Sequence, residues 1–356
     1  MKKKIFFKKI LNTKFKYKRN YNIRLGRLNE FKKLIKFIKN FWSYNHIFVK
    51  DKRLFNWQHK QNNQINFIIA EHKKTKKIHG ILGLVSKNFF KDKKIKKNDD
   101  IWIAIIKVEK SFNPPTGLGT SMIKFLVEKY QPKTLSALGI SREILRLYYF
   151  LGFKINYLKH FYIRNSSIKR NKIAKFKNKK NNKKINNNSQ FELNKLDTNY
   201  IYKNRKIIDK LDLHKNFSYL NKRFINHPIY KYIFLSITKN NKFFSLIVCR
   251  VFKAKQAKCL RIIDIFNLDK SLNLESEFLK YITKNSFEYV DLIYFGPKEK
   301  IIKKIGFKEK DKKMILPNYF EPFVRNNIEI SIAHLSDNLF EVFKADSDLD
   351  RPSKIR

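Results

Sequence analysis

The stretch DIWIAIIKVEKSFNPPTGLGTSMIKFLVEKY, residues 100–130, joins an apolar run to an amphipathic segment through a loop with two glycines. Residues 100–109 are almost continuously apolar, which predicts a buried central strand. Apolar side chains recur on one helical face over residues 122–130, which predicts a helix. Gly117 and Gly119 stand between the two, in a chain that contains only nine glycines.

These two glycines allow two interpretations. A helix that begins near Thr120 points unpaired backbone N–H groups at one place, and glycine lets phosphates approach the backbone closely. A pyrophosphate would therefore fit this turn. A plain tight connection between the helix and a strand that ends at Val108 explains Gly117 and Gly119 equally well. The G-x-G pattern alone therefore does not distinguish a phosphate site from a tight turn.

The composition is strongly basic, with 80 Lys and Arg against 29 Asp and Glu and a formal charge of +51. Such a charge is typical of nucleic-acid binding, because basic side chains displace counterions from phosphates. Here the excess is mostly Lys, scattered along the whole chain among much Asn, Ile, Phe and Tyr, as an AT-rich genome would impose. We therefore expect a solvated lysine surface and no dedicated nucleic-acid site.

Length and cysteine content narrow the class of protein. The 356 residues are enough for two domains, each with its own core. Cys249 and Cys259 are the only cysteines, so neither a disulfide framework nor a CxxC metal pair is expected. Lysines interrupt the apolar runs near the N-terminus, and no stretch of about 18 uncharged apolar residues occurs. We expect a cytoplasmic protein without a transmembrane segment.

The chain divides into two halves that repeat one order of elements. Residues 165–196 are rich in Lys and Asn and lose apolar periodicity, which is typical of a linker. On each side the pattern runs helix, strand pair, long central strand, helix, strand and helix, and the endings FLGFK and KIGFK match. An internal duplication of one α/β unit explains the repeat. The predicted ranges are a basic N-terminal arm at 1–22, a first unit at 23–164, the linker at 165–196, a second unit at 197–325 and a C-terminal tail at 326–356.

Several features of the first half occur together in one known superfamily. Gly117-Leu118-Gly119 follows the strand that ends at Val108, and Tyr148 with Gly152-Phe153 gives the pattern Y-x-x-x-G-F. In this order of elements they resemble the GCN5-related N-acetyltransferases (GNAT). The resemblance covers 24–164 well and 200–325 only as a fold, because the second half lacks the glycines. It implies an α/β (α+β) fold of two tandem GNAT-like mixed sheets flanked by helices.

For the donor, the resemblance implies acyl-CoA, such as acetyl-CoA, as a co-substrate and no tightly bound cofactor. Pantetheine is expected beside Ile106 and Val108, and Tyr148 matches the tyrosine that protonates the departing CoA thiolate. GNAT loops usually carry Gln or Arg ahead of the first glycine, where this chain has Pro-Pro-Thr at 114–116. The pyrophosphate is expected on the backbone of Gly117, Leu118, Gly119, Thr120 and Ser121.

Four further stretches are similar to tandem GNAT-like proteins encoded among genes for bacterial surface polysaccharides. They are NHIFVKDKRLFNWQH (45–59), HPIYKY (227–232), PNYFEPF (317–323) and FKADSDLDRP (343–352). This narrower resemblance implies acylation of an amino group on a nucleotide-linked sugar. The expected partners are therefore acyl-CoA and an amino sugar, and the oligomeric state is left open.

Amine acylation needs a proton acceptor and groups that orient the amine. The central strand offers no internal carboxylate, and the nearest are Asp100 at its start and Glu109 at its end. Asp100 is a candidate base, as are the two histidines of segment 45–59. Packing or hydrogen bonding within the scaffold is the alternative for each of these side chains. The candidate catalytic residues beside Tyr148 are His46, His59 and Asp100. The candidate acceptor contacts are Asn45, Trp57, Gln58, Tyr319 and Glu321.

The acidic end of the chain places Asp346, Asp348 and Asp350 at alternating positions. Alternating carboxylates suit a divalent cation, but the spacing lacks the glycine and the terminal Glu of a calcium loop. Salt bridges that dock this segment onto a lysine-rich domain, or contacts to the acceptor, are the favoured alternatives, and no metal site is expected.

The sequence leaves three functions open. The favoured one is a cytoplasmic acyl-CoA-dependent N-acyltransferase with one donor site, in the first half. The second is a transferase of the Fem type that uses aminoacyl-tRNA, which the Pro-Pro-Thr loop and the positive charge allow. The third is a degenerate, non-catalytic acyltransferase pair that acts as a basic binding protein.

Overall fold

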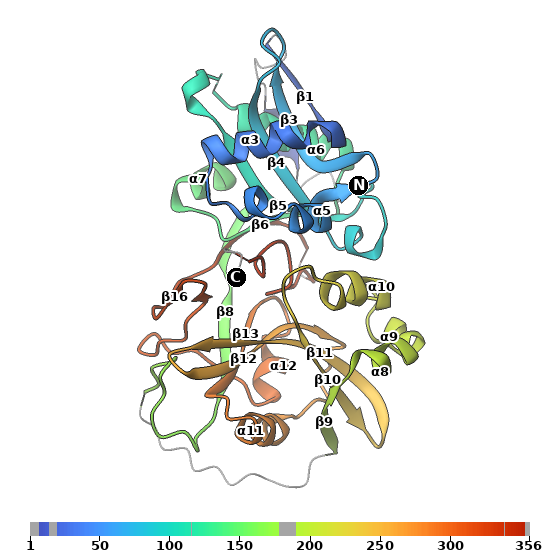
Figure 1. The fold of residues 1–356 in the computed structure, drawn as a ribbon, viewed down its shortest axis with the longest axis vertical. Coiled ribbons are helices and arrows are strands. Elements are labelled where there is room, and N and C mark those ends of the chain that lie inside the picture. The colour runs from blue at the N-terminus through green and yellow to red at the C-terminus, as the bar shows by residue number, and fades with distance from the viewer. Residues whose placement is uncertain (1–6, 14–19, 115, 178–189, 338, 353–356) are drawn as a thin grey trace.

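The computed structural model describes residues 7–13, 20–114, 116–177, 190–337 and 339–352. Two large mixed sheets, each flanked by helices, lie one above the other along the long axis of the molecule (Figure 1). This arrangement confirms the predicted α/β fold class with two tandem units. Within the described ranges, no helix is long and apolar enough to cross a lipid bilayer.

The first sheet is built mainly from the N-terminal half, in the order β1-β3-β4-β5-β6-β17-β7, with β2 on β3. Neighbours from β1 to β5 are antiparallel, whereas β5 and β6 are parallel. The apolar run of β5 gives it the predicted central place. The strands are β1 (Tyr21–Arg27), β2 (Lys60–Gln61), β3 (Gln64–His72), β4 (Ile78–Ser86), β5 (Asp100–Val108), β6 (Thr134–Leu138), β7 (Lys154–Tyr157) and β17 (Ser331–Leu335).

The second sheet repeats this plan in the order β14-β8-β13-β12-β11-β10-β9, with β18 on β13. Its long strands β11 and β12 are antiparallel, and β12 and β13 are parallel. The strands are β8 (Lys159–Arg164), β9 (Phe191–Leu196), β10 (Ile233–Lys239), β11 (Lys242–Ala254), β12 (Ala257–Phe266), β13 (Tyr289–Phe295), β14 (Lys308–Glu309) and β18 (Val342–Phe343); β15 (Tyr319–Phe320) and β16 (Phe323–Val324) form a separate hairpin.

Helices cover both faces of the first sheet. Ile81 packs with α3 and α5 and Leu82 with α6, and consecutive strand residues point to opposite faces. The α-helices are α2 (Lys8–Asn12), α3 (Phe31–Phe41), α4 (Ile47–Lys50), α5 (Lys52–His59), α6 (Leu118–Tyr130), α7 (Arg142–Phe150), α8 (Thr198–Lys203), α9 (Arg205–Leu211), α10 (Phe217–Leu220), α11 (Glu275–Lys284) and α12 (Glu299–Lys304). Shorter turns of 3-10 or π-helix lie at Leu28–Glu30, Phe89–Lys91, Lys110–Phe112 and Asn221–Ile225.

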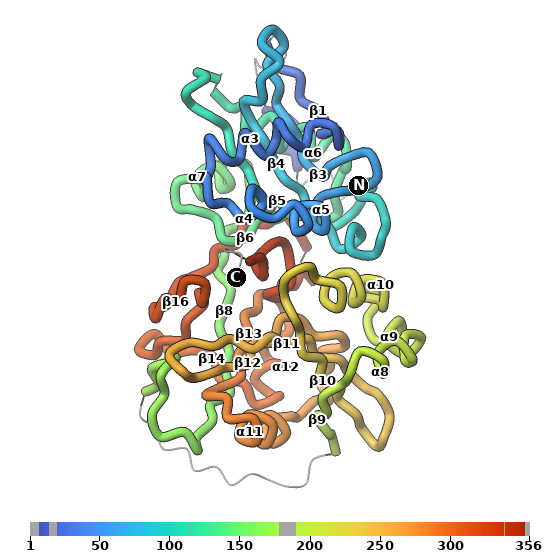
Figure 2. Tube along the Cα trace, viewed as in Figure 1, coloured from blue at the N-terminus to red at the C-terminus, as the bar shows by residue number. Residues whose placement is uncertain are grey.

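The two halves exchange strands. β8, which is the last strand of the range predicted for the first unit, lies between β13 and β14 of the second sheet. β17, which follows the second unit, lies between β6 and β7 of the first sheet. Figure 2 follows the green β8 segment down into the lower unit. Each sheet is therefore complete only with a strand from the other half of the chain, although the domain ranges given above stay a prediction.

One apolar core also runs through both units. The buried cluster that contains Met122 on α6 and Ile101 on β5 continues to Tyr219 and Phe266 of the second half. At the junction, the Trp57 indole Nε1–H donates to the Lys222 carbonyl at 2.7 Å. The surfaces that face each other between the sheets are thus packed together.

Candidate functional site

The parallel pairing of β5 and β6 ends before β5 does. The pairs run from Asp100 with Thr134 to Ile103 with Ala137, and β5 then continues to Val108. Ala104 is an extra residue relative to β4, a β-bulge that bends the strand where the pairing stops. We call residues 104–108 the open edge of β5, because no described residue pairs with it on the β6 side.

The predicted glycine turn lies against this open edge. Gly117 precedes α6 with a φ of +89°, and Ser121 N donates to Gly117 O at 2.9 Å as the first intrahelical bond. The N–H groups at 118–120 therefore have no acceptor within the helix. A Cβ added to Gly119 would lie 3.5 Å from the Val108 side chain and 3.8 Å from that of Ile106. The structure thus brings the predicted donor residues of strand and turn together.

Two side chains of this turn point into the protein. Thr120 and Ser121 are buried, and the Ser121 hydroxyl donates to the Gly117 carbonyl at 2.9 Å. Leu118 is also buried, in the core beneath α6. The turn therefore offers a ligand its backbone, as the sequence analysis expects, rather than side-chain hydroxyls.

Tyr148 lies on α7 and is 1% exposed. Its ring packs edge to face on Phe153, with 4.9 Å between centroids, so the Y-x-x-x-G-F pattern is a local contact. Burial raises the pKa of Tyr148, which keeps the phenol protonated at neutral pH. A protonated phenol is the form that a proton donor requires.

The two histidines predicted as bases are packed among aromatic rings. His46 caps α4 by accepting from Phe48 N at 3.2 Å, and His59 is fully buried between Phe48 and Phe67. Burial, with the nearby charge of Arg351 as a second cause, lowers the pKa of each histidine to about 3. Each imidazole is therefore neutral at pH 7 but a weak base, and the catalytic roles of both stay predictions.

The other predicted acceptor residues lie in two places, joined by a chain of contacts from Trp57 through the stacked rings of His227 and Tyr230 to Glu321. Trp57 joins the two units, Gln58 is fully buried and hydrogen-bonds His59 at 3.2 Å, and Asn45 is exposed. Tyr319, which is half exposed, and Glu321 belong to the hairpin on the second unit, where Glu321 accepts from the Tyr230 hydroxyl at 3.1 Å. The structure does not bring these two sets of residues together around the open edge.

Asp100 lies at the other end of β5 from the glycine turn. Its Oδ1 accepts from the Thr134 hydroxyl at 2.8 Å, across the first parallel pair. It also lines a polar pocket of about 180 Å³ at this end of the sheet. At about 3.3 Å per residue the open edge begins about 13 Å away along the strand, so Asp100 does not face the glycine turn.

Two residues that the sequence analysis missed lie beside the open edge. Trp102 and Ser136 are register partners in the last pair but one before the strands separate, and both are buried. Neither the Trp102 Nε1–H nor the Ser136 hydroxyl has a hydrogen-bond partner among the described residues. Buried polar atoms normally have partners, and these two are among several in the described residues that have none. Trp102 had appeared only as part of an apolar run, and nothing in the sequence pairs it with Ser136.

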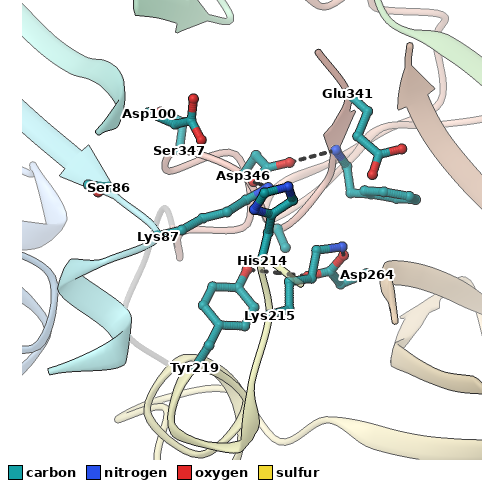
Figure 3. A network of polar contacts seen from close by, with 12 residues as sticks. Ser86, Lys87, Asp100, His214, Lys215, Tyr219, Asp264, Glu341, Asp346 and Ser347 are labelled. Atoms are coloured by element: carbon teal, nitrogen blue, oxygen red, sulfur yellow. Dashed lines mark hydrogen bonds and ion pairs between the residues drawn. The ribbon is translucent and has the colours of Figure 1, made fainter. Parts of the chain in front are cut away.

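The C-terminal segment, residues 342–352, docks between the units. β18 pairs with the end of β13, and Ala345 N donates to Ile263 O on β12 at 2.9 Å. Asp346 then forms an ion pair with Lys87 of the first unit at 3.4 Å (Figure 3). Asp350 pairs with Arg250 of the second unit at 2.6 Å. The docking interpretation of the acidic segment is confirmed, and the described residues contain no group of three or more His, Cys, Asp or Glu placed to hold a metal ion.

Comparison with known proteins concerns the fold. No protein-family model matches the sequence, and no curated protein matches it significantly. The structure is similar to a GCN5-related N-acetyltransferase from Anabaena variabilis ATCC 29413, with a TM-score of 0.52 and 9% identity over 88% of this chain and 72% of that one.

Two other solved structures give lower scores. One is a GCN5-related glucosamine N-acetyltransferase region of a fungal β-N-acetylglucosaminidase, with a TM-score of 0.46 and 8% identity over 88% of this chain and 38% of that one. The other is Saccharomyces cerevisiae N-myristoyltransferase with bound myristoyl-CoA. Its TM-score is 0.43, with 8% identity over 97% of this chain and 86% of that one. On the first similarity, this chain has the fold of the GCN5-related N-acetyltransferases, built as two tandem units.

Proposed function

We propose that this protein is an acyl-CoA-dependent N-acyltransferase with a single donor site, at the open edge of β5. The observation that carries the proposal is the contact between that edge and the first turn of α6. An unpaired strand edge offers backbone groups to the amides of a pantetheine arm, and the N–H groups at 118–120 suit a pyrophosphate. The fold, shared with acetyltransferases, agrees with this donor.

The proposed reaction uses the backbone of this edge and, by the resemblance to the GNAT enzymes, the Tyr148 phenol. The acceptor's amine nitrogen attacks the thioester carbonyl to form the C–N bond, and an unpaired N–H of the open edge stabilises the oxyanion. The C–S bond then breaks, the departing thiolate takes a proton from the Tyr148 phenol, and the phenolate regains a proton from solvent before the next turnover. The amine loses its extra proton to solvent, because histidines with a pKa of about 3 hold protons poorly.

For the acceptor we propose an amino group on a nucleotide-linked sugar, in surface-polysaccharide biosynthesis. The similarity of segments 45–59 and 343–352 to proteins of that type supports this choice. The docked segment adds to it, since it lies between the units next to the first sheet, where Leu349 approaches Gly139 at the end of β6. If the second unit contributes one wall of the acceptor site, the close packing of the two units is explained.

The donor proposal is tested by Gly119→Glu. The added carboxylate would stand at the helix N-terminus where the pyrophosphate is expected, so like charges would repel. Wild-type protein should melt at a higher temperature with acetyl-CoA, and Gly119→Glu should lose that increase. Leu339→Glu, which adds the same charge at an 81% exposed position, is the control and should keep it.

The competing donor, aminoacyl-tRNA, gives the opposite result in the same assay. The assay also includes acyl-CoA donors with longer acyl chains. If charged tRNA raises the melting temperature of the protein, and neither acetyl-CoA nor a longer acyl-CoA does, the proposed donor is wrong. A melting temperature raised equally in wild type and Gly119→Glu would mean that acyl-CoA binds elsewhere.

A further inference from the structure

The C-terminal end of α7 exposes two adjacent aromatic rings. Tyr149 is 74% exposed and Phe150 is 67% exposed, which are the highest values for any Phe, Tyr or Trp side chain among the described residues. Figure 1 shows α7 at the outer side of the upper unit and not between the two units. Single exposed apolar side chains are ordinary on protein surfaces, whereas two large rings in the same helical turn call for an explanation.

The second unit shows that the fold itself does not require these rings. The matching endings FLGFK and KIGFK align α7 with α12 residue by residue. In this alignment Tyr149 and Phe150 correspond to Lys303 and Lys304, which are both exposed at the end of α12. The same helix end therefore accommodates two solvated charges in one unit and carries two exposed rings in the other.

The groups around the rings are cationic. Arg146 lies three and four residues before the rings, which is one helical turn away on the same face of α7. Lys154 begins β7 just after the helix. Lys9 of α2 lies against the turn between them, because a Cβ added to Gly152 would be 3.1 Å from its side chain. All three basic side chains are exposed. We call Lys9, Arg146, Tyr149, Phe150 and Lys154 the α7 surface.

Acidic side chains do not neutralise this surface. Residues 144–160 contain no Asp or Glu, and neither does α2. The acidic residue of α7 is Glu143, which lies in the first turn of the helix, about two turns before the rings. The basic residues of α7 are Arg142 and Arg146, although most basic residues of the chain are Lys. A guanidinium can bind a phosphate through two parallel N–H groups, which an ammonium cannot.

Two rings surrounded by cations match the surface of an anionic bilayer. Aromatic side chains favour the boundary between headgroups and hydrocarbon, and basic side chains are attracted to anionic lipids. A second copy of this chain is a poorer partner, because it would bring the same cations together on proteins with a formal charge of +51. Charge complementarity therefore favours the bilayer.

We propose that the α7 surface docks the protein on an anionic lipid bilayer, with the two rings at the interface and the cations on lipid phosphates. The contact is peripheral and reversible, since two rings bury little apolar area. This interaction goes beyond the proposed function and does not depend on it.

The contribution of the rings is tested by sedimenting the full chain with vesicles of phosphatidylcholine that contain about 30% phosphatidylglycerol. Tyr149→Gln/Phe150→Gln should weaken binding about tenfold, because no ring is left to enter the interface. Leu213→Gln/Leu339→Gln is the matched control and should bind as the wild type does. It removes two apolar side chains that are 96% and 81% exposed, from other places on the surface.

The contribution of the cations is tested with the same vesicles. Arg146→Gln/Lys154→Gln should weaken binding about tenfold or more. Lys280→Gln/Lys300→Gln removes the same charge from exposed positions on the second unit and should bind nearly as the wild type does. All four variants change exposed side chains, so each should keep the wild-type melting temperature. Vesicles of phosphatidylcholine alone should bind the wild type far less.

Three results of the vesicle assay would overturn the proposal. They are no binding of the wild type to the anionic vesicles, full binding of the ring variant, and equal losses in the two charge variants. Sedimentation velocity without lipid tests the competing partner, a second copy of the chain. If the wild type is a dimer, the ring variant a monomer and their vesicle binding the same, the α7 surface is a contact between copies and the membrane proposal is wrong.

Discussion

In both sheets the parallel pairing of the central strand stops at a bulge, and the two units differ in what lies beside the strand beyond that point. In the first sheet, the parallel pairs end at Ile103 with Ala137, and the next residue, Ala104, is a bulge. In the second sheet they end at Ile262 with Leu292, and the next residue, Ile263, is also a bulge. There the chain's own Ala345 N–H bonds the bulge carbonyl, so the second opening is filled from within.

The two sheets also differ at the residue pair that comes just before the last parallel pair. The positions of Trp102 and Ser136 correspond in register to Arg261 and Asp291 of the second sheet. The latter two form a fully buried ion pair at 2.7 Å, and Arg261 also donates to the Pro317 carbonyl. At this pair the second unit satisfies both side chains itself, whereas the first keeps a hydroxyl and an indole N–H without a described partner.

The helices that follow the two central strands also differ. α11 carries Glu275 and Glu277 in its first turn, which would repel a pyrophosphate, and Gly306 packs against Glu275. α6 has no acidic residue in its first turn, and a glycine, Gly117, precedes its first residue. Three independent differences therefore favour a donor in the first unit and a structural role for the second.

The largest effect is expected from the strand exchange that joins the units. Ala333 on β17 is fully buried between β6 and β7 of the first sheet. Ala333→Asp would bury an unpaired carboxylate and should lower the free energy of unfolding by several kcal/mol. Thermal unfolding should show the loss, and Glu329→Ala, at an exposed position just before β17, should not. If the first unit does not need β17 for its stability, the melting temperature should change little in either variant.

The next effect concerns pH, because the first unit buries His59 completely. Its pKa is lowered to about 3 in the folded protein, so only the unfolded chain takes up a proton as the pH falls below about 6.5. Stability should therefore decrease toward acid pH, and His59→Leu should remove about 1 kcal/mol per pH unit of that slope. Denaturant unfolding at pH 7 and pH 5 measures it, with exposed His214→Leu as the control. An unchanged slope in His59→Leu would mean that the imidazole is hydrated in the folded protein.

The sequence predicted the elements better than their assembly. Apolar periodicity and glycine placement located β5, the turn at Gly117 and α6, because these depend on local patterns. The exchange of β8 and β17 depends on which edges meet in three dimensions, and no local pattern records it. The register that pairs Trp102 with Ser136 is likewise a property of the folded sheet, so the sequence alone could not bring these two side chains together.

A smaller effect is expected at the segment that closes the second opening. Ala345→Pro removes the N–H that bonds Ile263 O, which leaves a buried carbonyl unpaired and should cost about 1–3 kcal/mol. Acetyl-CoA should still stabilise this variant, because the proposed donor lies in the first unit. Ala345→Gly keeps the N–H and is the matched control. Loss of the acetyl-CoA response in the proline variant alone would show that the second opening takes part in donor binding.

The smallest effect on stability separates the two glycines of the turn. Gly117 has a φ of +89°, so Gly117→Ala should cost about 1–2 kcal/mol, because a side chain strains this conformation. Gly119 is helical, and a Cβ added to it would lie 3.5 Å from its nearest neighbour, the Val108 side chain, which is an ordinary contact. Gly119→Ala should therefore leave stability nearly unchanged or raise it slightly. The added methyl would still lie between the N–H groups of the turn and the open edge, and it should weaken acetyl-CoA binding. Melting temperatures with and without acetyl-CoA measure both quantities. Retention of full acetyl-CoA affinity in Gly119→Ala would show that the donor does not approach this face of the turn, and the comparison between the two units would then lose its functional meaning.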